Sequence, residues 1–281
     1  MTARQIALVS LSKKPTHREL SQTAAALQKQ ATRDLGPLWG FEAMVNFFPD
    51  MKSVPFGYWP IIVMDKLDDP SAAGYHTDKH HQPYALVEYD DDWQLTCSHE
   101  MCEMMVDPWG NKLATGGSPK SDQGKVHFLV EVCDPCEDAS HAYSINGILM
   151  SDFYTPNFFD PQKVHGVRYS YTGSIAEPRQ VLKNGYLSWH DPKSGKWFQQ
   201  TYFGTKSTIK PIAGMMSYGS SLRGQMDRLV KNPNVKKAFA AKSIKHKNIH
   251  EGVQDSGAYA TEAWKKEISR YVKGGKVEEL F

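Results

Sequence analysis

The chain has 281 residues, a net charge of +2 at pH 7, 40% hydrophobic residues and 23% charged residues. This composition excludes a disordered, collagen-like or coiled-coil protein, and no apolar run approaches the ~18–20 residues that cross a bilayer. We therefore expect a soluble cytoplasmic protein with one large or two smaller domains and no membrane partner.

The first half of the sequence predicts strands and helices in alternation. A capping box at Thr16–Glu19 and apolar residues at helical spacing predict a helix through Leu35, which Gly36-Pro37 should end. A second helix should span residues 93–106 and end at Asp107-Pro108. Short apolar runs predict four strands, of which the last is a candidate sheet edge: Ile6–Ser10, Ala43–Phe48, Ile61–Asp65 and Tyr84–Tyr89.

The second half predicts mostly strands, followed by a basic tail. Strands are expected at residues 127–133 and 143–150, a tight turn at Asn184-Gly185, and a hairpin whose strands flank residues 191–195. From Ser221 onward the chain reads as helical and carries 13 Lys/Arg against 7 Asp/Glu. We therefore expect an α+β fold with a first domain over residues 1–212, including a β-rich extension, and a basic helical region over 213–281.

Four cysteines are present, at positions 97, 102, 133 and 136. In a cytoplasmic protein they are expected to be thiols and not disulfides. A four-thiolate zinc site is disfavoured, because Cys97 and Cys102 would lie about 140° apart around a helix.

The segment Ser98-His-Glu-Met-Cys-Glu-Met-Met-Val-Asp-Pro108 carries the strongest chemical pattern. On a helix His99 and Glu103 stand one turn apart, about 6 Å, and could share one divalent ion. Glu100 lies beside them, where the HExxH motif places its general base. A solvated helix face is the plainer interpretation of such a pattern, but the surrounding apolar residues predict a buried helix, in which these groups need partners.

A third metal ligand is expected from the acidic run that follows the strand at 127–133. Glu131 and Asp134 are both candidates, and the alternation of side chains along the strand does not decide between them. Asp107 lies about 12 Å along the helix from His99, too far for joint ligation. It is expected to support the ligands from behind or to mark the end of the helix.

The sequence resembles zincin metallopeptidases, and most closely a group of bacterial and phage proteins known as HExxE-type peptidases. The resemblance covers residues 6–204. It rests on Gln28–Gly40, Gly74-Tyr-His76, the helix motif Ser98–Pro108, Glu131-Val-Cys-Asp-Pro-Cys-Glu137 and Asn146-Gly147. Glu103 departs from the best-known zincins, which have His at this position.

The resemblance implies a zincin-like mixed sheet whose edge strand aligns a protein or peptide substrate, with the motif helix behind it. It also implies zinc as the cofactor, His99 and Glu103 as zinc ligands and Glu100 as the base. Two anionic ligands would weaken the Lewis acidity of the ion, so we expect slow or substrate-restricted hydrolysis. His76, Tyr75 and Tyr143 are candidate groups for stabilising the oxyanion.

Two alternatives remain open from the sequence. The ion could be a structural element of a protein without catalytic activity. Alternatively, the lysine-rich stretch within residues 221–250 could bind nucleic acid or another anionic partner, although a solvated helical arm is the plainer interpretation of such a charge run. The oligomeric state stays open.

Overall fold

The computed structural model describes residues 3–69, 72–215 and 221–229. All described residues belong to a single compact unit. The domain boundary that the sequence suggests at residue 212 stays a prediction. Most of the expected basic tail, including its lysine cluster, lies outside the described residues.

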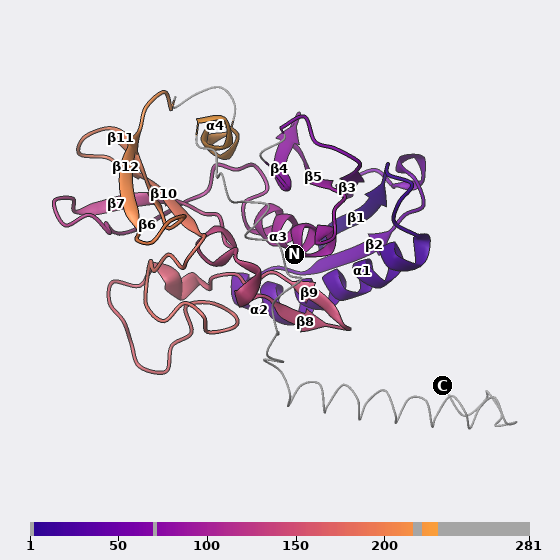
Figure 1. The fold of residues 1–281 in the computed structure, drawn as a ribbon, viewed down its shortest axis with the longest axis horizontal. Coiled ribbons are helices and arrows are strands. Elements are labelled where there is room, and N and C mark those ends of the chain that lie inside the picture. The colour runs from indigo at the N-terminus through magenta and orange to yellow at the C-terminus, as the bar shows by residue number, and fades with distance from the viewer. Residues whose placement is uncertain (1–2, 70–71, 216–220, 230–281) are drawn as a thin grey trace, which may run out of the picture. The chain divides into compact units, whose positions relative to one another are not determined.

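A five-stranded mixed sheet forms the N-terminal part of this unit (Figure 1). Its order is β2-β1-β3-β5-β4, with neighbours parallel except β4, which runs antiparallel to β5. The internal strand β1 is buried on both faces, as the apolar run Ile6–Val9 requires. The strands are β1 (Arg4–Ser10), β2 (Ala43–Phe47), β3 (Trp59–Met64), β4 (Gly74–Lys79) and β5 (Gln82–Glu88).

The sheet edge differs from the sequence prediction. The expected edge strand Tyr84–Tyr89 corresponds to β5, which is internal, and the edge is β4. Strand β4 has the sequence Gly-Tyr-His-Thr-Asp-Lys, which lacks the apolar alternation that would identify it as a strand. The outcome places His76 on the edge strand itself.

Helix α1 (His17–Lys29) and helix α3 (Trp93–Val106) cover the sheet and contact each other (Figure 1). Helix α1 begins with the predicted capping box at Thr16 and Glu19. The prediction that Gly36-Pro37 ends the helix is wrong: the chain continues through a π-helical turn (Gln30–Leu35) into α2 (Gly36–Trp39). Pro37 lies in the first turn of α2, where its fixed φ suits a helical backbone.

Helix α3 (Trp93–Val106) has the predicted bounds and is buried along nearly its whole length. It follows β5 and packs against β3, β4 and β5, so its side chains lie close to the sheet edge. A polar network fixes α3 to the first helical segment: Ser98 donates to Gln30, which donates to the carbonyl of Ser151. The backbone N–H of Ser151 in turn donates to the hydroxyl of Ser98.

A second, antiparallel sheet has the order β12-β11-β10-β7-β6. It contains the predicted hairpin, β10 (Tyr186–Asp191) and β11 (Lys196–Thr201), and two strands that the sequence analysis missed, β6 (Leu113–Gly117) and β12 (Thr208–Ile212). Strand β7 (Lys125–Leu129) ends earlier than predicted. Residues 143–150 form a hairpin, β8 (Tyr143–Ile145) and β9 (Ile148–Met150), around a turn with positive φ at Asn146 and Gly147. Several sheets and few helices agree with an α+β fold.

The short helix α4 (Leu222–Leu229) packs through Met226 against Leu129 and Trp197. No helix among the described residues is both long and apolar enough for a membrane span. The four cysteines are buried free thiols, as predicted.

Asp152 is a buried carboxylate outside the motif helix, and it makes stability depend on pH. It accepts hydrogen bonds from the amides of Phe153 and Thr172 and from the Thr172 hydroxyl. Burial nevertheless raises the pKa of Asp152 from 3.8 to about 6. Because the unfolded chain releases this proton near pH 4 and the folded protein holds it to about pH 6, stability from this group falls as pH rises between these values.

We expect Asp152→Asn to remove that dependence and to stabilise the protein at pH 7 by about 2 kcal/mol, with no gain at pH 4. Asn keeps the acceptor for the two amides, and the Thr172 hydroxyl can turn to accept from the new amide group. Urea unfolding at pH 4, 5, 6 and 7 with a chelator present measures the effect. Asp68→Asn, at an exposed position, is the matched control. Equal gains at all four pH values would contradict the assignment.

Candidate metal centre

The motif residues of α3 face one another, as their spacing predicts. His99 Nε2 lies 3.4 Å from Glu103 Oε1, and both side chains are almost fully buried. The backbone N–H of Cys133 donates to the same Glu103 oxygen over 3.3 Å. The helix therefore presents an imidazole and a carboxylate to one point, against the chain segment that follows β7.

Asp134 completes this group. Its Oδ1 lies 3.5 Å from His99 Nε2, and the ligand atoms of His99, Glu103 and Asp134 all lie within 4.8 Å of one another. Pro135 turns the chain into a 3-10 helix at Asp134–Cys136. Gly185 lies directly against this backbone. A Cβ at position 185 would lie 2.6 Å from the Pro135 carbonyl oxygen and 2.7 Å from the Asp134 carbonyl oxygen.

A second group of potential ligands shares Glu103. His76 Nδ1 lies 3.6 Å from Glu100 Oε2 and 3.6 Å from Glu103 Oε2. The other ring nitrogen of His76 lies 3.2 Å from the backbone carbonyl of Asp107. His76 comes from the edge strand β4, so the sheet edge and α3 together build this group.

Arg223 of α4 contributes a cation that the sequence analysis did not anticipate. Its Nη1 lies 3.0 Å from Glu103 Oε2 and 3.3 Å from Asp134 Oδ2, and it also contacts Glu131 Oε2. Glu131 is thus paired with Arg223, whereas Asp134 joins His99. Of the two open candidates for the third ligand, only Asp134 lies in the group with His99 and Glu103.

A close backbone approach lets α4 bring Arg223 to this position. The Arg223 N–H donates to the Gly110 carbonyl over 2.9 Å, and the Leu222 N–H donates to Asn111. Gly110 has a φ of 59°, and a Cβ there would lie 2.7 Å from Arg223 Cβ. A side chain at position 110 would therefore be strained by the backbone and would collide with Arg223.

Burial and charge shift the ionisation of these groups. Burial alone would lower the pKa of His99, but the Glu103 carboxylate raises it well above its usual value. Burial and the Glu103 charge raise the pKa of Asp134 to about 6. Both shifts reflect carboxylates crowded away from water, an arrangement that a bound cation would relieve.

The donor set fits a divalent ion. Two ligand atoms bound about 2.1 Å from one ion at the tetrahedral angle lie ~3.4 Å apart, close to the 3.4 and 3.5 Å found around His99 Nε2. Asp134 Oδ1 is buried with no hydrogen-bond partner among the described residues. Imidazole with carboxylates suits zinc and similar transition ions. His99, Glu103 and Asp134 are therefore the residues that would hold a metal.

Glu100 lies between this group and the edge strand. A Cβ on Gly74 of β4 would lie 2.6 Å from Thr96 Cγ2 and 3.1 Å from Glu100 Oε1. The absence of a side chain at Gly74 therefore lets α3 approach the sheet edge closely enough to place Glu100 beside it.

We expect Gly74→Ala to lower the free energy of unfolding by about 1–3 kcal/mol through overpacking. Adding Thr96→Ser should recover much of the loss, because it deletes the Cγ2 atom of the closest contact. Gly117→Ala is the matched control, since nothing lies within 4 Å of a Cβ there. Thermal and urea unfolding of the four proteins measure the effect, and a double variant no more stable than Gly74→Ala would refute this cause.

Asp107 and Tyr143, which the sequence also singles out, belong to neither group of potential metal ligands. The carboxylate of Asp107 accepts the N–H groups of Asn111 and Lys112 just after α3, so it organises the end of the helix while its carbonyl holds His76. Tyr143 donates its hydroxyl to Asp34 over 2.8 Å, in a buried cluster that is separate from the metal group. The structure gives no support to an oxyanion role for Tyr143.

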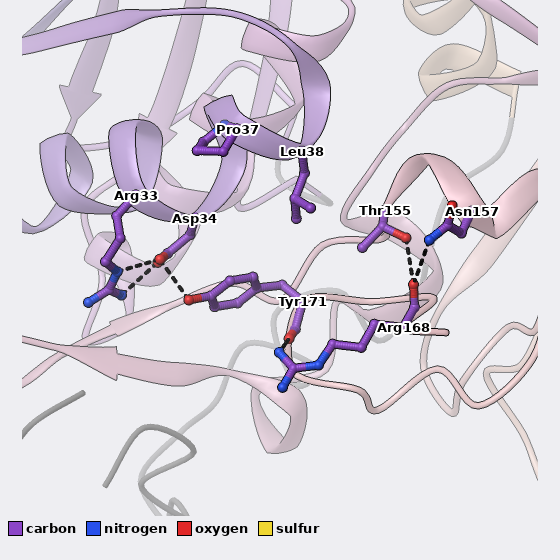
Figure 2. Close-up of a pocket in the computed structure, with 8 residues that line it drawn as sticks. All are labelled: Arg33, Asp34, Pro37, Leu38, Thr155, Asn157, Arg168 and Tyr171. Carbon is purple, nitrogen blue, oxygen red and sulfur yellow. Dashed lines mark hydrogen bonds and ion pairs between the residues drawn. The ribbon is translucent and has the colours of Figure 1, made fainter. Parts of the chain in front are cut away.

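Asp34 also lines a pocket, which Figure 2 shows together with residues of the π-helical turn, α2 and the segment 155–171. The volume of this pocket is about 240 Å³. Asp34 is paired there with Arg33 and also accepts from the Tyr171 hydroxyl. No residue of the two potential metal groups lines this pocket.

Sequence reasoning missed three residues near the centre. Glu137 is buried, and burial together with the Asp134 charge raises its pKa well above the usual value. Tyr154 is fully buried, its hydroxyl has no hydrogen-bond partner among the described residues, and burial and the Glu131 charge raise its pKa. No local sequence pattern identifies Arg223 as part of the centre, because the basic tail contains many similar residues.

No protein-family model matches the sequence, and searches of curated proteins and of solved structures find no significant match.

Proposed function

We propose that the protein is a zinc-dependent metallopeptidase that hydrolyses a peptide bond in a protein or peptide substrate. The proposal rests chiefly on the convergence of His99, Glu103 and Asp134 within 4.8 Å, with Glu100 beside them on the same helix. Imidazole and carboxylate ligands with a further carboxylate beside them are the parts that metal-assisted hydrolysis requires.

The sheet edge supports a peptide substrate. Strand β4 pairs with β5 on one side and with no other strand among the described residues. An extended peptide could add to the other side of β4 through backbone hydrogen bonds. Glu100 Oε1 lies near Gly74 of this strand, so the substrate backbone would pass close to the proposed base. A mixed sheet with the motif helix behind its edge resembles the zincin arrangement.

Glu100 has a different role in the proposed hydrolysis from Glu103 and Asp134. A zinc ion, when bound, lowers the pKa of a coordinated water to ~7 and polarises the scissile carbonyl. Glu100 accepts the proton of the attacking water and passes it to the leaving amine. Glu103 and Asp134 neutralise the ion, which favours slow hydrolysis or hydrolysis restricted to well-positioned substrates.

Metal content and peptide cleavage together test this function. Purified wild-type protein, loaded with zinc, should cleave members of a fluorescence-quenched peptide library, and a chelator should stop the cleavage. His99→Ala should lose cleavage and the zinc ion that Glu103 and Asp134 help to hold, whereas His80→Asn, at an exposed turn with positive φ that Asn tolerates, should retain both. A metal-loaded protein that cleaves neither the library nor unfolded proteins would refute the proposal.

A non-catalytic metal-stabilised protein is the second candidate, and the burial of the site favours it. His99, Glu103 and Asp134 are each at most 2% exposed, and structural metal sites are closed whereas catalytic ones keep an open position. Under this alternative zinc raises the melting temperature, and Glu100→Gln changes neither the zinc ion held by His99, Glu103 and Asp134 nor any binding activity.

A further inference from the structure

Glu103 turns its two carboxylate oxygens toward different groups. Oε1 lies 3.4 Å from His99 Nε2, in the group that includes Asp134. Oε2 lies 3.6 Å from His76 Nδ1, in the group that includes Glu100, and it also accepts a hydrogen bond from Arg223 Nη1 over 3.0 Å. A carboxylate in this position can bridge two cations, one on each oxygen.

The tautomer of His76 is fixed by its second nitrogen. The Asp107 carbonyl, 3.2 Å from Nε2, can only accept a hydrogen bond, so Nε2 carries the hydrogen. In the neutral ring Nδ1 then presents a lone pair to Glu100 Oε2, 3.6 Å away. Two acceptors that face each other repel unless a proton or a metal ion lies between them.

His76 Nδ1 and Glu100 Oε2 are both enclosed within the described part of the protein. His76 is 1% exposed and Glu100 is 3% exposed. Both His76 Nδ1 and Glu100 Oε2 are buried and lack a hydrogen-bond partner among the described residues. The separations of 3.6 Å on either side of Nδ1 are again close to the ~3.4 Å expected for ligands of one tetrahedral ion.

The centre is rich in buried carboxylates. Five of them are at most 5% exposed: Glu100, Glu103, Glu131, Asp134 and Glu137. Arg223 contacts three of the five, Glu103, Glu131 and Asp134. These three contacts do not include Glu100, so a second ion would add positive charge where Glu100 and Glu103 face His76.

We propose that the protein holds a second divalent ion between His76 Nδ1, Glu100 Oε2 and Glu103 Oε2, with Glu103 bridging it to the ion held by His99 and Asp134. The inference rests on the metal centre of the proposed function and extends it to a dinuclear site. Two ions about 3.5–4 Å apart are the arrangement by which many hydrolases hold both the attacking and the leaving atom. Glu100 would keep Oε1, which faces Gly74, for proton transfer.

Zinc stoichiometry of the full chain is the first test. After removal of metal and titration with Zn²⁺, we expect two equivalents per wild-type chain and two for the His80→Asn control. His76→Ala should retain one equivalent and His99→Ala one, because each removes a ligand of one ion only. A wild-type stoichiometry of one, or two equivalents in His76→Ala, would overturn the inference; the first result would mean that His76 is instead a protonated partner of the two glutamates.

A second measurement on the wild type requires no variant to fold. Two Mn²⁺ ions bridged by one carboxylate are magnetically coupled, so the electron paramagnetic resonance spectrum at full loading should differ from that of isolated Mn²⁺. An isolated-ion spectrum at every loading would exclude the bridge. Peptide cleavage is scored separately: two coupled ions without cleavage would support the dinuclear site and refute the peptidase, and one ion with cleavage would do the reverse.

Discussion

Glu100→Gln is expected to lower kcat for peptide cleavage by about 10²–10⁴-fold, the range that a general base contributes. The amide has nearly the shape of the carboxylate but cannot accept the proton of the attacking water. Glu100 is not a member of the group formed by His99, Glu103 and Asp134, so zinc held by those three residues should remain. Cleavage rates at saturating peptide, measured beside the zinc content of the same samples, give the result.

Glu177→Gln is the matched control, because Glu177 is exposed and far from α3 in sequence; its kcat should equal that of the wild type. A Glu100→Gln protein that still cleaves at the wild-type rate would remove Glu100 from the mechanism. A protein that loses all its zinc would show that Glu100 is needed to hold the metal and would leave its role as base without support.

The motif helix could be predicted because its signals are local. The i and i+4 spacing of His99 and Glu103 determines which helix face they share, and the structure places their ligand atoms 3.4 Å apart. The apolar residues between them predict burial, which the structure confirms for residues 95–106 of α3.

The third ligand could not be chosen because the answer depends on one bend. In a straight continuation of β7, Glu131 and Asp134 would point to opposite faces. The chain instead leaves the strand after Leu129 and forms a 3-10 turn at Asp134–Cys136. That turn directs Asp134 to His99 and leaves Glu131 for Arg223.

His76 and Arg223 could not be placed because their contacts are tertiary. Strand β4 is an edge strand with polar residues, so its sequence resembles that of a loop. Arg223 lies 120 positions after Glu103 in the chain, and its approach depends on Gly110, whose positive φ leaves no periodic signal. Sequence periodicity reports which face of an element is buried, but not which distant element covers it.

Arg223 gives the other large expected effect. Its guanidinium contacts Glu103, Glu131 and Asp134 while only 5% exposed. Arg223→Met keeps much of the side-chain volume and removes the charge, so three buried carboxylates lose their shared cation. Breaking a buried ion pair on one side typically costs about 3–5 kcal/mol. We expect a loss of this size in the free energy of unfolding of the metal-free protein, measured by urea titration with a chelator, and little change for Arg18→Met at an exposed position.

Variants of the partner carboxylates test whether the lost charge causes the destabilisation of Arg223→Met. Glu131→Gln removes the charge that Arg223→Met leaves without its cation. The double variant Arg223→Met/Glu131→Gln should therefore lose less stability than the sum of the two single losses. We expect a coupling energy of about 1–3 kcal/mol. Saturating zinc should also reduce the loss in Arg223→Met, because a bound ion supplies positive charge to Glu103 and Asp134. Additive losses that zinc does not change would mean that Arg223 stabilises the protein by packing alone, and that the carboxylates at this centre do not require a cation.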